Sequence, residues 1–218
     1  MDLSNIDWRA LLLGYPVLLL ALTVHETAHA WTADRLGDPT ARLLGRVSLN
    51  PIAHIDIVGT VIFPILAFIT HIPLIGWAKP VPVNPLHLRH PSRDDMLVSL
   101  AGPASNLLLA ALMFVVYVVL KLTGAFTAIP PNFAEPVLRI VVLGVYINIL
   151  LCVFNLVPIP PLDGSHVLEH FLPYGARESY RRLETFGYLI IMFLFATGIL
   201  GVIIQPAMWV VSLLFHLV

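Results

Sequence analysis

Two histidines and a glutamate stand close together inside an apolar segment of this chain. The run reads His25-Glu26-Thr27-Ala28-His29, and Ala10 to Val24 before it carry no charge. Positions i and i+4 share one face of a helix, so both imidazoles can bind one zinc ion, and the adjacent carboxylate can act on a water molecule. Because three ionisable groups are costly in hydrocarbon, we interpret them as a metal site.

The two histidines leave the predicted site incomplete, since catalytic zinc usually has three protein ligands. The candidates for the third ligand are Asp163, His54, Asp56 and His166. Asp163 follows prolines at 158, 160 and 161, which end a helix and force an extended turn. That turn can return its carboxylate to the membrane plane, but Asp163 can equally cap a helix beginning near Gly164. For Asp56 the capping role is favoured, whereas the sequence leaves a turn and an outer contact to the site equally open for His54.

Composition places the chain in a lipid bilayer. Of its 218 residues 58% are hydrophobic and 11% charged, against roughly 25% charged in soluble domains. The net charge of −1 gives no basis for binding nucleic acid. A single cysteine, Cys152, excludes an internal disulfide.

Four segments are long and apolar enough to be membrane spans, which need about 20 residues. They are Arg9–Leu36, Met96–Leu122, Glu135–Pro158 and the block 186–218, which is either one span or a hairpin interrupted at Gln205-Pro206. A shorter segment, 57–72, contains Pro64. If it does not cross, most basic residues fall on one side, so the positive-inside rule predicts a re-entrant segment and an outside N-terminus.

Strand-like segments lie between the first two spans. Residues 42–49 and 78–84 are bounded by prolines, and Pro80 and Pro82 remove amides from one edge of the second segment. We therefore expect a small β-sheet at the cytoplasmic membrane face, with the amides of Val81 and Val83 free to pair with an extended substrate. In the following span, we expect Gly102-Pro103 to serve close helix packing and Asn106 an interhelical hydrogen bond.

Five motifs together resemble the site-2 protease family of intramembrane zinc metalloproteases, in its minimal prokaryotic form without a PDZ or CBS domain. They cover most of the chain from Thr23 to Gly164. The motifs are His25-Glu26-Thr27-Ala28-His29, Gly45 to Pro51 with His54, Gly76 to Pro85, Ala101 to Asn106, and Asn155 to Gly164.

The resemblance implies roles for individual residues. By it, His25, His29 and Asp163 bind one Zn²⁺ per chain, Glu26 is the general base, and Asn155 stabilises the oxyanion. It also implies that the substrates are transmembrane proteins, cleaved in or near their membrane segments.

The sequence thus predicts an α-helical integral membrane protein, a multi-span bundle with a small cytoplasmic β-sheet. We expect one membrane-embedded domain over 1–218, with core motifs in 23–164, in a prokaryotic inner or plasma membrane. The alternative function is a zinc-binding carrier, sensor or inactive scaffold without hydrolysis. Retention of Glu26 argues against a scaffold, and the single polar cluster argues against a carrier.

Overall fold

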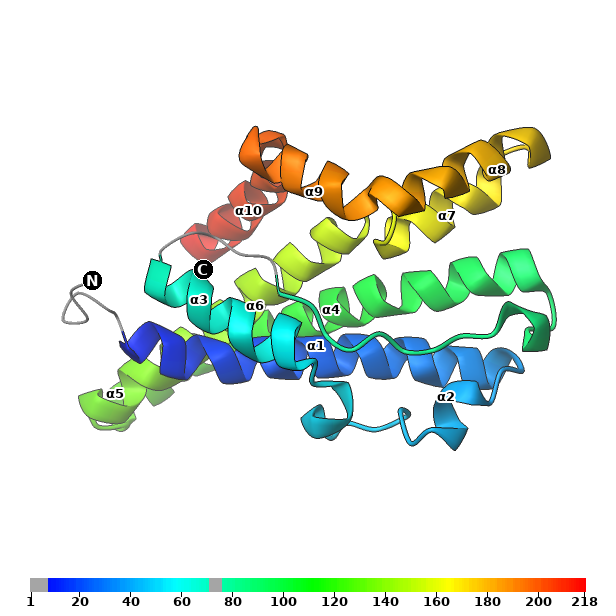
Figure 1. Cartoon of the computed structure of the whole chain (residues 1–218). Helices are drawn as coiled ribbons and strands as arrows, with labels where there is room; N and C mark the ends of the chain where they lie inside the picture. The colour runs from blue at the N-terminus through cyan, green and yellow to red at the C-terminus, as the bar shows by residue number, and fades with distance from the viewer. Residues whose placement is uncertain (1–7, 71–75) are drawn as a thin grey trace.

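Three long helices form the centre of the molecule in the computed structural model, which describes residues 8–70 and 76–218 (Figure 1). They are α1 (Trp8–Leu36), α4 (Pro91–Leu122) and α6 (Pro131–Asn155), and each packs against the other two. Prolines at the first positions of α4 and α6 suit helix starts, where no amide hydrogen bond is lost. The predicted helical bundle is confirmed.

Within the described residues, three helices have the length and apolar composition of a membrane span: α4, α6 and α10 (Ile199–Leu217). The first two correspond to the predicted spans Met96–Leu122 and Glu135–Pro158. The predicted span Arg9–Leu36 corresponds to α1, whose 29 residues extend about 43 Å at the usual rise. That α1 crosses the bilayer remains a prediction.

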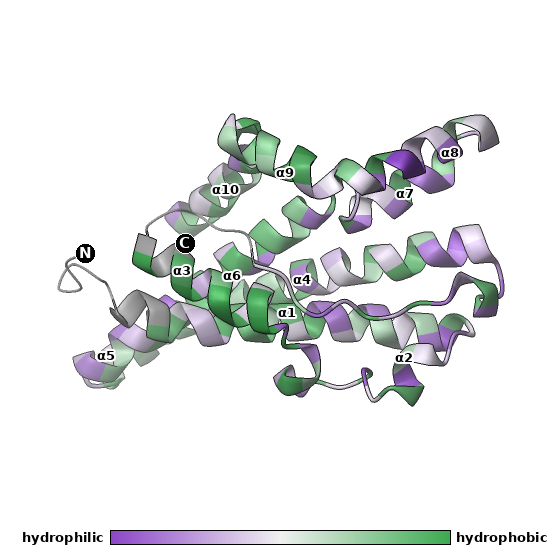
Figure 2. Ribbon diagram, in the orientation of Figure 1, coloured by the Kyte–Doolittle hydropathy of each residue, from purple (hydrophilic) through white to green (hydrophobic). Residues whose placement is uncertain are grey.

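The short elements gather mainly at the two ends of the bundle. At the end to the right in Figure 1 lie α2 (Thr40–Leu43), α7 (Asp163–Phe171) and α8 (Tyr174–Arg181), and α5 (Ala125–Ala128) lies at the opposite end. Polar residues are concentrated along α7, α8 and the start of α4 (Figure 2). The right-hand end therefore has the character of a surface that faces water. Other short turns are Pro51–His54, Pro85–His87 and Arg182–Phe186.

The shorter apolar segment folds as a π-helical turn (Ile57–Ile62) that continues into α3 (Phe63–Thr70). Its 14 residues extend about 21 Å, which is less than the hydrocarbon thickness of about 30 Å. The amide of Trp77 donates to the carbonyl of Gly59 (3.3 Å), so the chain returns to the beginning of the element. This geometry favours the predicted re-entrant segment, although residues 71–72 of the prediction lie outside the described part.

The predicted β-sheet is wrong for the residues that the structure describes, none of which forms a strand. Residues 76–84 instead make an irregular strap, which Figure 1 shows running beside α1 and α4. The strap donates single hydrogen bonds to loops, such as Lys79 N to His54 O (2.9 Å). The Val81 amide, expected at a free strand edge, donates to the Glu26 carboxylate (3.1 Å). Pro80 and Pro82 remove the amides of one edge, and Glu26 occupies the Val81 amide of the other, so no ladder forms here.

The C-terminal block is two helices joined by a turn, α9 (Gly187–Ala196) and α10. The interruption falls at Gly198, whose positive φ of 76° suits glycine, and not at Gln205-Pro206 as predicted. Pro206 lies inside α10. With 10 residues, α9 is too short to cross a bilayer.

The returning segment 57–77 can be tested by labelling single cysteines in a Cys152→Ala background. Leu44 and Leu86 flank this segment and are 64% and 88% exposed. We expect Leu44→Cys and Leu86→Cys to react with an impermeant maleimide from the same side of the membrane, and Leu122→Cys, at the far end of α4, from the other. Labelling of Leu44→Cys and Leu86→Cys from opposite sides would show that the segment crosses.

Candidate metal centre

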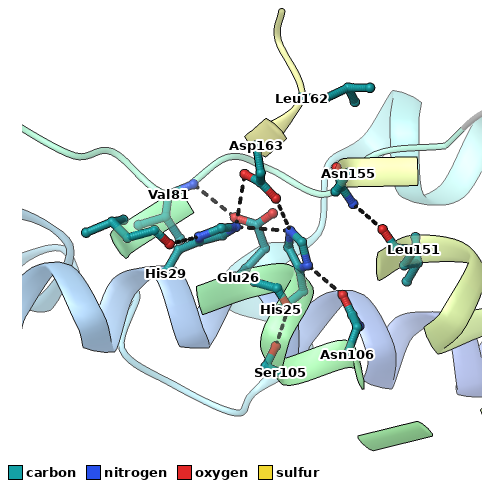
Figure 3. A network of polar contacts seen from close by, with 12 residues as sticks. His25, Glu26, His29, Val81, Ser105, Asn106, Leu151, Asn155, Leu162 and Asp163 are labelled. Carbon is teal, nitrogen blue, oxygen red and sulfur yellow. Dashed lines mark hydrogen bonds and ion pairs between the residues drawn. The ribbon is translucent and has the colours of Figure 1, made fainter. Parts of the chain in front are cut away.

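His25 and His29 lie one turn apart on α1 and point toward the same spot (Figure 3). They are 5% and 8% exposed, and their Nε2 atoms are 3.0 Å apart. A helix turn of this kind places i and i+4 side chains on one face, as the sequence predicted. Two imidazole nitrogens therefore meet inside the bundle.

Asp163 completes the cluster from the first turn of α7. Its carboxylate oxygens lie 3.2 Å from His25 Nε2 and 3.4 Å from His29 Nε2. The proline-rich turn after α6 brings it there, and Gly164 permits this turn to pack closely, because a Cβ at Gly164 would meet the carbonyl oxygens of Leu156 and Val157. One ligand atom from each of the three residues lies within 4.8 Å of the others.

Hydrogen bonds on the far side of each ring determine which imidazole nitrogen faces the cluster. His29 Nδ1 lies 2.7 Å from the carbonyl oxygen of Val98, and His25 Nδ1 lies 2.6 Å from Asn106 Oδ1. A carbonyl oxygen only accepts, so both Nδ1 atoms carry the proton and donate it. In the neutral imidazoles, which a metal requires, both Nε2 atoms then present lone pairs to each other and to the Asp163 carboxylate.

This donor set fits a divalent cation. Two lone pairs and a carboxylate repel one another at these distances unless a positive charge lies among them. Asp163 Oδ2 is buried and has no hydrogen-bond partner among the described residues. Two imidazoles and one carboxylate match the three protein ligands of a catalytic zinc site, whereas magnesium and calcium prefer oxygen ligands alone.

Gly102 of α4 leaves room for the imidazoles. A Cβ at this position would fall 2.5 Å from His25 Cε1 and still closer to His29 Nε2. The predicted close packing at Gly102 is therefore confirmed, and its partner is the histidine pair itself.

Glu26 lies beside the cluster, half-buried, on the side of α1 that faces the strap. Its Oε2 accepts the Val81 amide hydrogen (3.1 Å). The buried Arg46 guanidinium donates to the carbonyl oxygens of Lys79 and Pro80, just before that amide. The strap is thus held at two consecutive peptide groups, and Glu26 Oε1 is left without a partner from the strap.

The other predicted residues have different positions. Asn155, at the end of α6, donates its side-chain amide to Leu151 O of its own helix (3.0 Å). Asp56 caps the π-helical turn by accepting from the amides of Val58 and Gly59, as favoured. His54 is buried, with Nε2 2.8 Å from the carbonyl oxygen of Ser48 and 3.4 Å from the hydroxyl of Thr27 in α1, so it contacts both the turn and the α1 motif. His166 pairs with Asp95 (2.9 Å), and this hydrogen bond raises the pKa of His166.

The sequence analysis missed two side chains that act on the site. Asn148 of α6 is 1% exposed and bonds Asn106, and Arg46 holds the strap. Asn148 had a detectable signal, because a lone amide amid apolar residues of a span must find a partner. Arg46 lies inside the Gly45 to Pro51 motif, but nothing in the sequence indicates which backbone carbonyls it binds.

Comparison with known proteins agrees with this site. The model of peptidase family M50 matches residues 14–137 and 132–198. "Putative zinc metalloprotease YwhC" of Bacillus subtilis (strain 168) is 35% identical over 189 residues, covering 87% of this chain and 82% of that protein. "Putative zinc metalloprotease Rip2" of Mycolicibacterium smegmatis (strain ATCC 700084 / mc(2)155) is 34% identical over 183 residues, covering 84% and 66%. No solved structure was found to match.

The apolar helices and the matched family define a membrane-embedded metalloprotease. The chain belongs to peptidase family M50. It is an intramembrane zinc metalloprotease, and the predicted resemblance is confirmed. Zinc as the metal agrees with the relatives' names and with the cluster of His25, His29 and Asp163.

Gly102→Ala tests the space at the cluster. The added methyl group would overlap the His29 and His25 rings, so we expect purified protein to lose most of its zinc, measured by elemental analysis. Gly201→Ala in α10 is the matched control, because a Cβ there has no neighbour within 4 Å. Full zinc occupancy in Gly102→Ala would show that the metal is bound elsewhere.

Proposed function

We propose that this chain is a site-2 type endopeptidase that binds one zinc ion through His25, His29 and Asp163. Glu26 is its general base, and its substrates are transmembrane proteins. The observation that carries the proposal is the convergence of two imidazoles and a carboxylate, with a second, separately held carboxylate beside them. The family supports the class of reaction, and the apolar helices support a bilayer as its place.

Zinc bound at these residues supplies a Lewis acid that acidifies water and polarises a peptide carbonyl. The protein's own contribution to proton transfer comes from Glu26. The Val81 amide fixes Oε2, which leaves Oε1 to accept a proton from the attacking water and then deliver it to the leaving amine nitrogen. Arg46, through the carbonyls of Lys79 and Pro80, keeps that amide in place.

Asn155 is proposed to stabilise the oxyanion. Its side chain is half-buried at the end of α6, on the same side of the site as Asp163 (Figure 3). Its amide now donates to Leu151, so the role requires a side-chain rotation that exchanges this hydrogen bond for one to the substrate.

The proposed substrates enter as unwound segments, because a helix hides its peptide bonds in backbone hydrogen bonds. We place the enzyme in a prokaryotic inner or plasma membrane, as one protease domain over 1–218. The arrangement of the basic residues supports a cytoplasmic orientation of the water-facing end. Arg42 and Arg181 belong to α2 and α8 at the water-facing end, and Lys121 lies at the end of α4 nearer α5.

Glu26→Gln and Asp163→Ala separate the base from the ligand. Glu26→Gln should retain zinc and lose about 10²–10⁴-fold in turnover, because an amide cannot accept the proton. Asp163→Ala should lose zinc as well as activity. Both are measured with purified protein and a panel of single-span membrane substrates, with and without chelator. Cleavage by Glu26→Gln near the parent rate would exclude the proposed base.

Val81→Pro tests the amide that holds Glu26. Proline removes this donor while suiting a position between Pro80 and Pro82, and a hydrogen bond to a charged group contributes roughly 1.5–3 kcal/mol. Turnover should fall about tenfold or more at unchanged zinc content. Val81→Ala keeps the amide and is the matched control. Equal turnover of the two variants would show that the hydrogen bond has no part in the reaction.

A further inference from the structure

A line of buried polar groups connects α6 to the metal centre through α4. Asn148 is 1% exposed, Asn106 0% and His25 5%. Asn106 Nδ2 lies 2.8 Å from Asn148 Oδ1, and Asn106 Oδ1 lies 2.6 Å from His25 Nδ1. Figure 3 shows Asn106 directly behind the His25 ring, on the side away from Asp163.

The direction of each hydrogen bond in this line is determined by backbone carbonyls. Asn148 Nδ2 donates to Gly144 O (2.8 Å), so its Oδ1 must face Asn106. Asn106 Nδ2 donates to that oxygen and also to Ala21 O (3.2 Å). Both amide hydrogens of Asn106 are therefore used, and its Oδ1 is left to accept the His25 Nδ1 proton.

We propose that Asn106, and Asn148 acting through it, are positioning residues that hold His25 in the tautomer and ring orientation that zinc requires. The inference rests on the proposed ligand role of His25. With its proton held on Nδ1, the imidazole keeps the Nε2 lone pair toward the cluster. Without an acceptor at Asn106, the proton can move to Nε2, where it blocks coordination.

The two ligand histidines differ in how they are supported. His29 is held by the backbone carbonyl of Val98, which no side-chain substitution removes. His25 depends on side chains from two other helices. A competing interpretation is that the asparagines only join helices, as polar groups do in membranes. That interpretation predicts changes in stability without a specific change in zinc affinity.

The test is a double-mutant cycle of Asn106→Leu and Asn148→Leu, with zinc affinity measured by chelator competition on the purified detergent-solubilised protein. Removing a partner behind a metal ligand typically costs 10–100-fold in affinity, and we expect about this loss in Asn106→Leu. Asn148→Leu should lose less, because Ala21 O still holds the Asn106 amide. The double variant should bind zinc no more weakly than Asn106→Leu alone, since the line is already broken.

Ser105→Ala is the matched control, because Ser105 neighbours Asn106 and its hydroxyl bonds only to Gly102 O of its own helix among the described residues. It should bind zinc like the parent. Unchanged zinc affinity in Asn106→Leu would overturn the proposal. Losses that simply add in the double variant would exclude action of Asn148 through Asn106.

Asn106→Asp provides a second variant of nearly equal volume should the leucine variants not fold. Its carboxylate still accepts from His25 but opposes the oxygens of Asn148 and Ala21. We expect zinc affinity nearer the parent than in Asn106→Leu, together with a lower melting temperature of the zinc-free protein than the parent shows. If the role of Asn106 is purely structural, zinc affinity should fall in proportion to the loss of stability. A zinc affinity in Asn106→Asp that falls along with the melting temperature, to the level of Asn106→Leu, would therefore overturn the proposal.

His25→Ala separates failure of this inference from failure of the proposed site. Zinc retained in His25→Ala would refute the ligand assignment itself. Zinc lost in His25→Ala but bound at parent affinity in Asn106→Leu would refute only the positioning role.

Discussion

The structure depends on placing three side chains that could hold a metal ion, His25, His29 and Asp163, inside a bundle of apolar helices. Buried ionisable groups are costly unless they are paired, and lipid offers no water to compensate them. The cost is kept low here because every imidazole nitrogen has a defined partner: Nδ1 donates to Val98 O or Asn106 Oδ1, and Nε2 faces Asp163. A divalent cation among these atoms would supply the missing positive charge. The surrounding helix contacts can be understood from this requirement.

The packing of α1 against α4 shows how. Ala21, His25 and His29 repeat every four residues on α1, and Val98, Gly102 and Asn106 do so on α4. In antiparallel order, Val98 O faces His29, Gly102 faces both rings, and Asn106 faces His25 and the Ala21 carbonyl. Successive turns of α4 thus place an acceptor opposite His29, an empty space opposite both rings, and an amide opposite His25. Pro103 follows the empty position and removes a backbone donor there.

The sequence specifies the local parts of this arrangement better than the tertiary parts. His25, Glu26 and His29 share a helix, so their spacing alone predicted their convergence, and the interhelical hydrogen bond of Asn106 was predicted from its place in a span. Asp163 was one of four open candidates, because it lies 134 residues beyond His29 and periodicity along α1 cannot place it. Only the resemblance selected it, and the structure places it at the cluster.

The predicted β-sheet failed for a related reason. Pro80 and Pro82 do indicate an extended chain with one usable edge, but the sequence could not show what occupies that edge. In the structure the Val81 amide has a carboxylate partner, and a charged acceptor forms a stronger hydrogen bond than a neutral carbonyl does. The same contact therefore both occupies the amide that a ladder would need and orients the Glu26 carboxylate, the proposed base. An extended substrate passing along the strap would compete with Glu26 for this amide, so orientation of the base and binding of substrate at residue 81 are mutually exclusive. If Glu26 is held by the Val81 amide during proton transfer, as proposed, an extended substrate has to pair elsewhere on the strap.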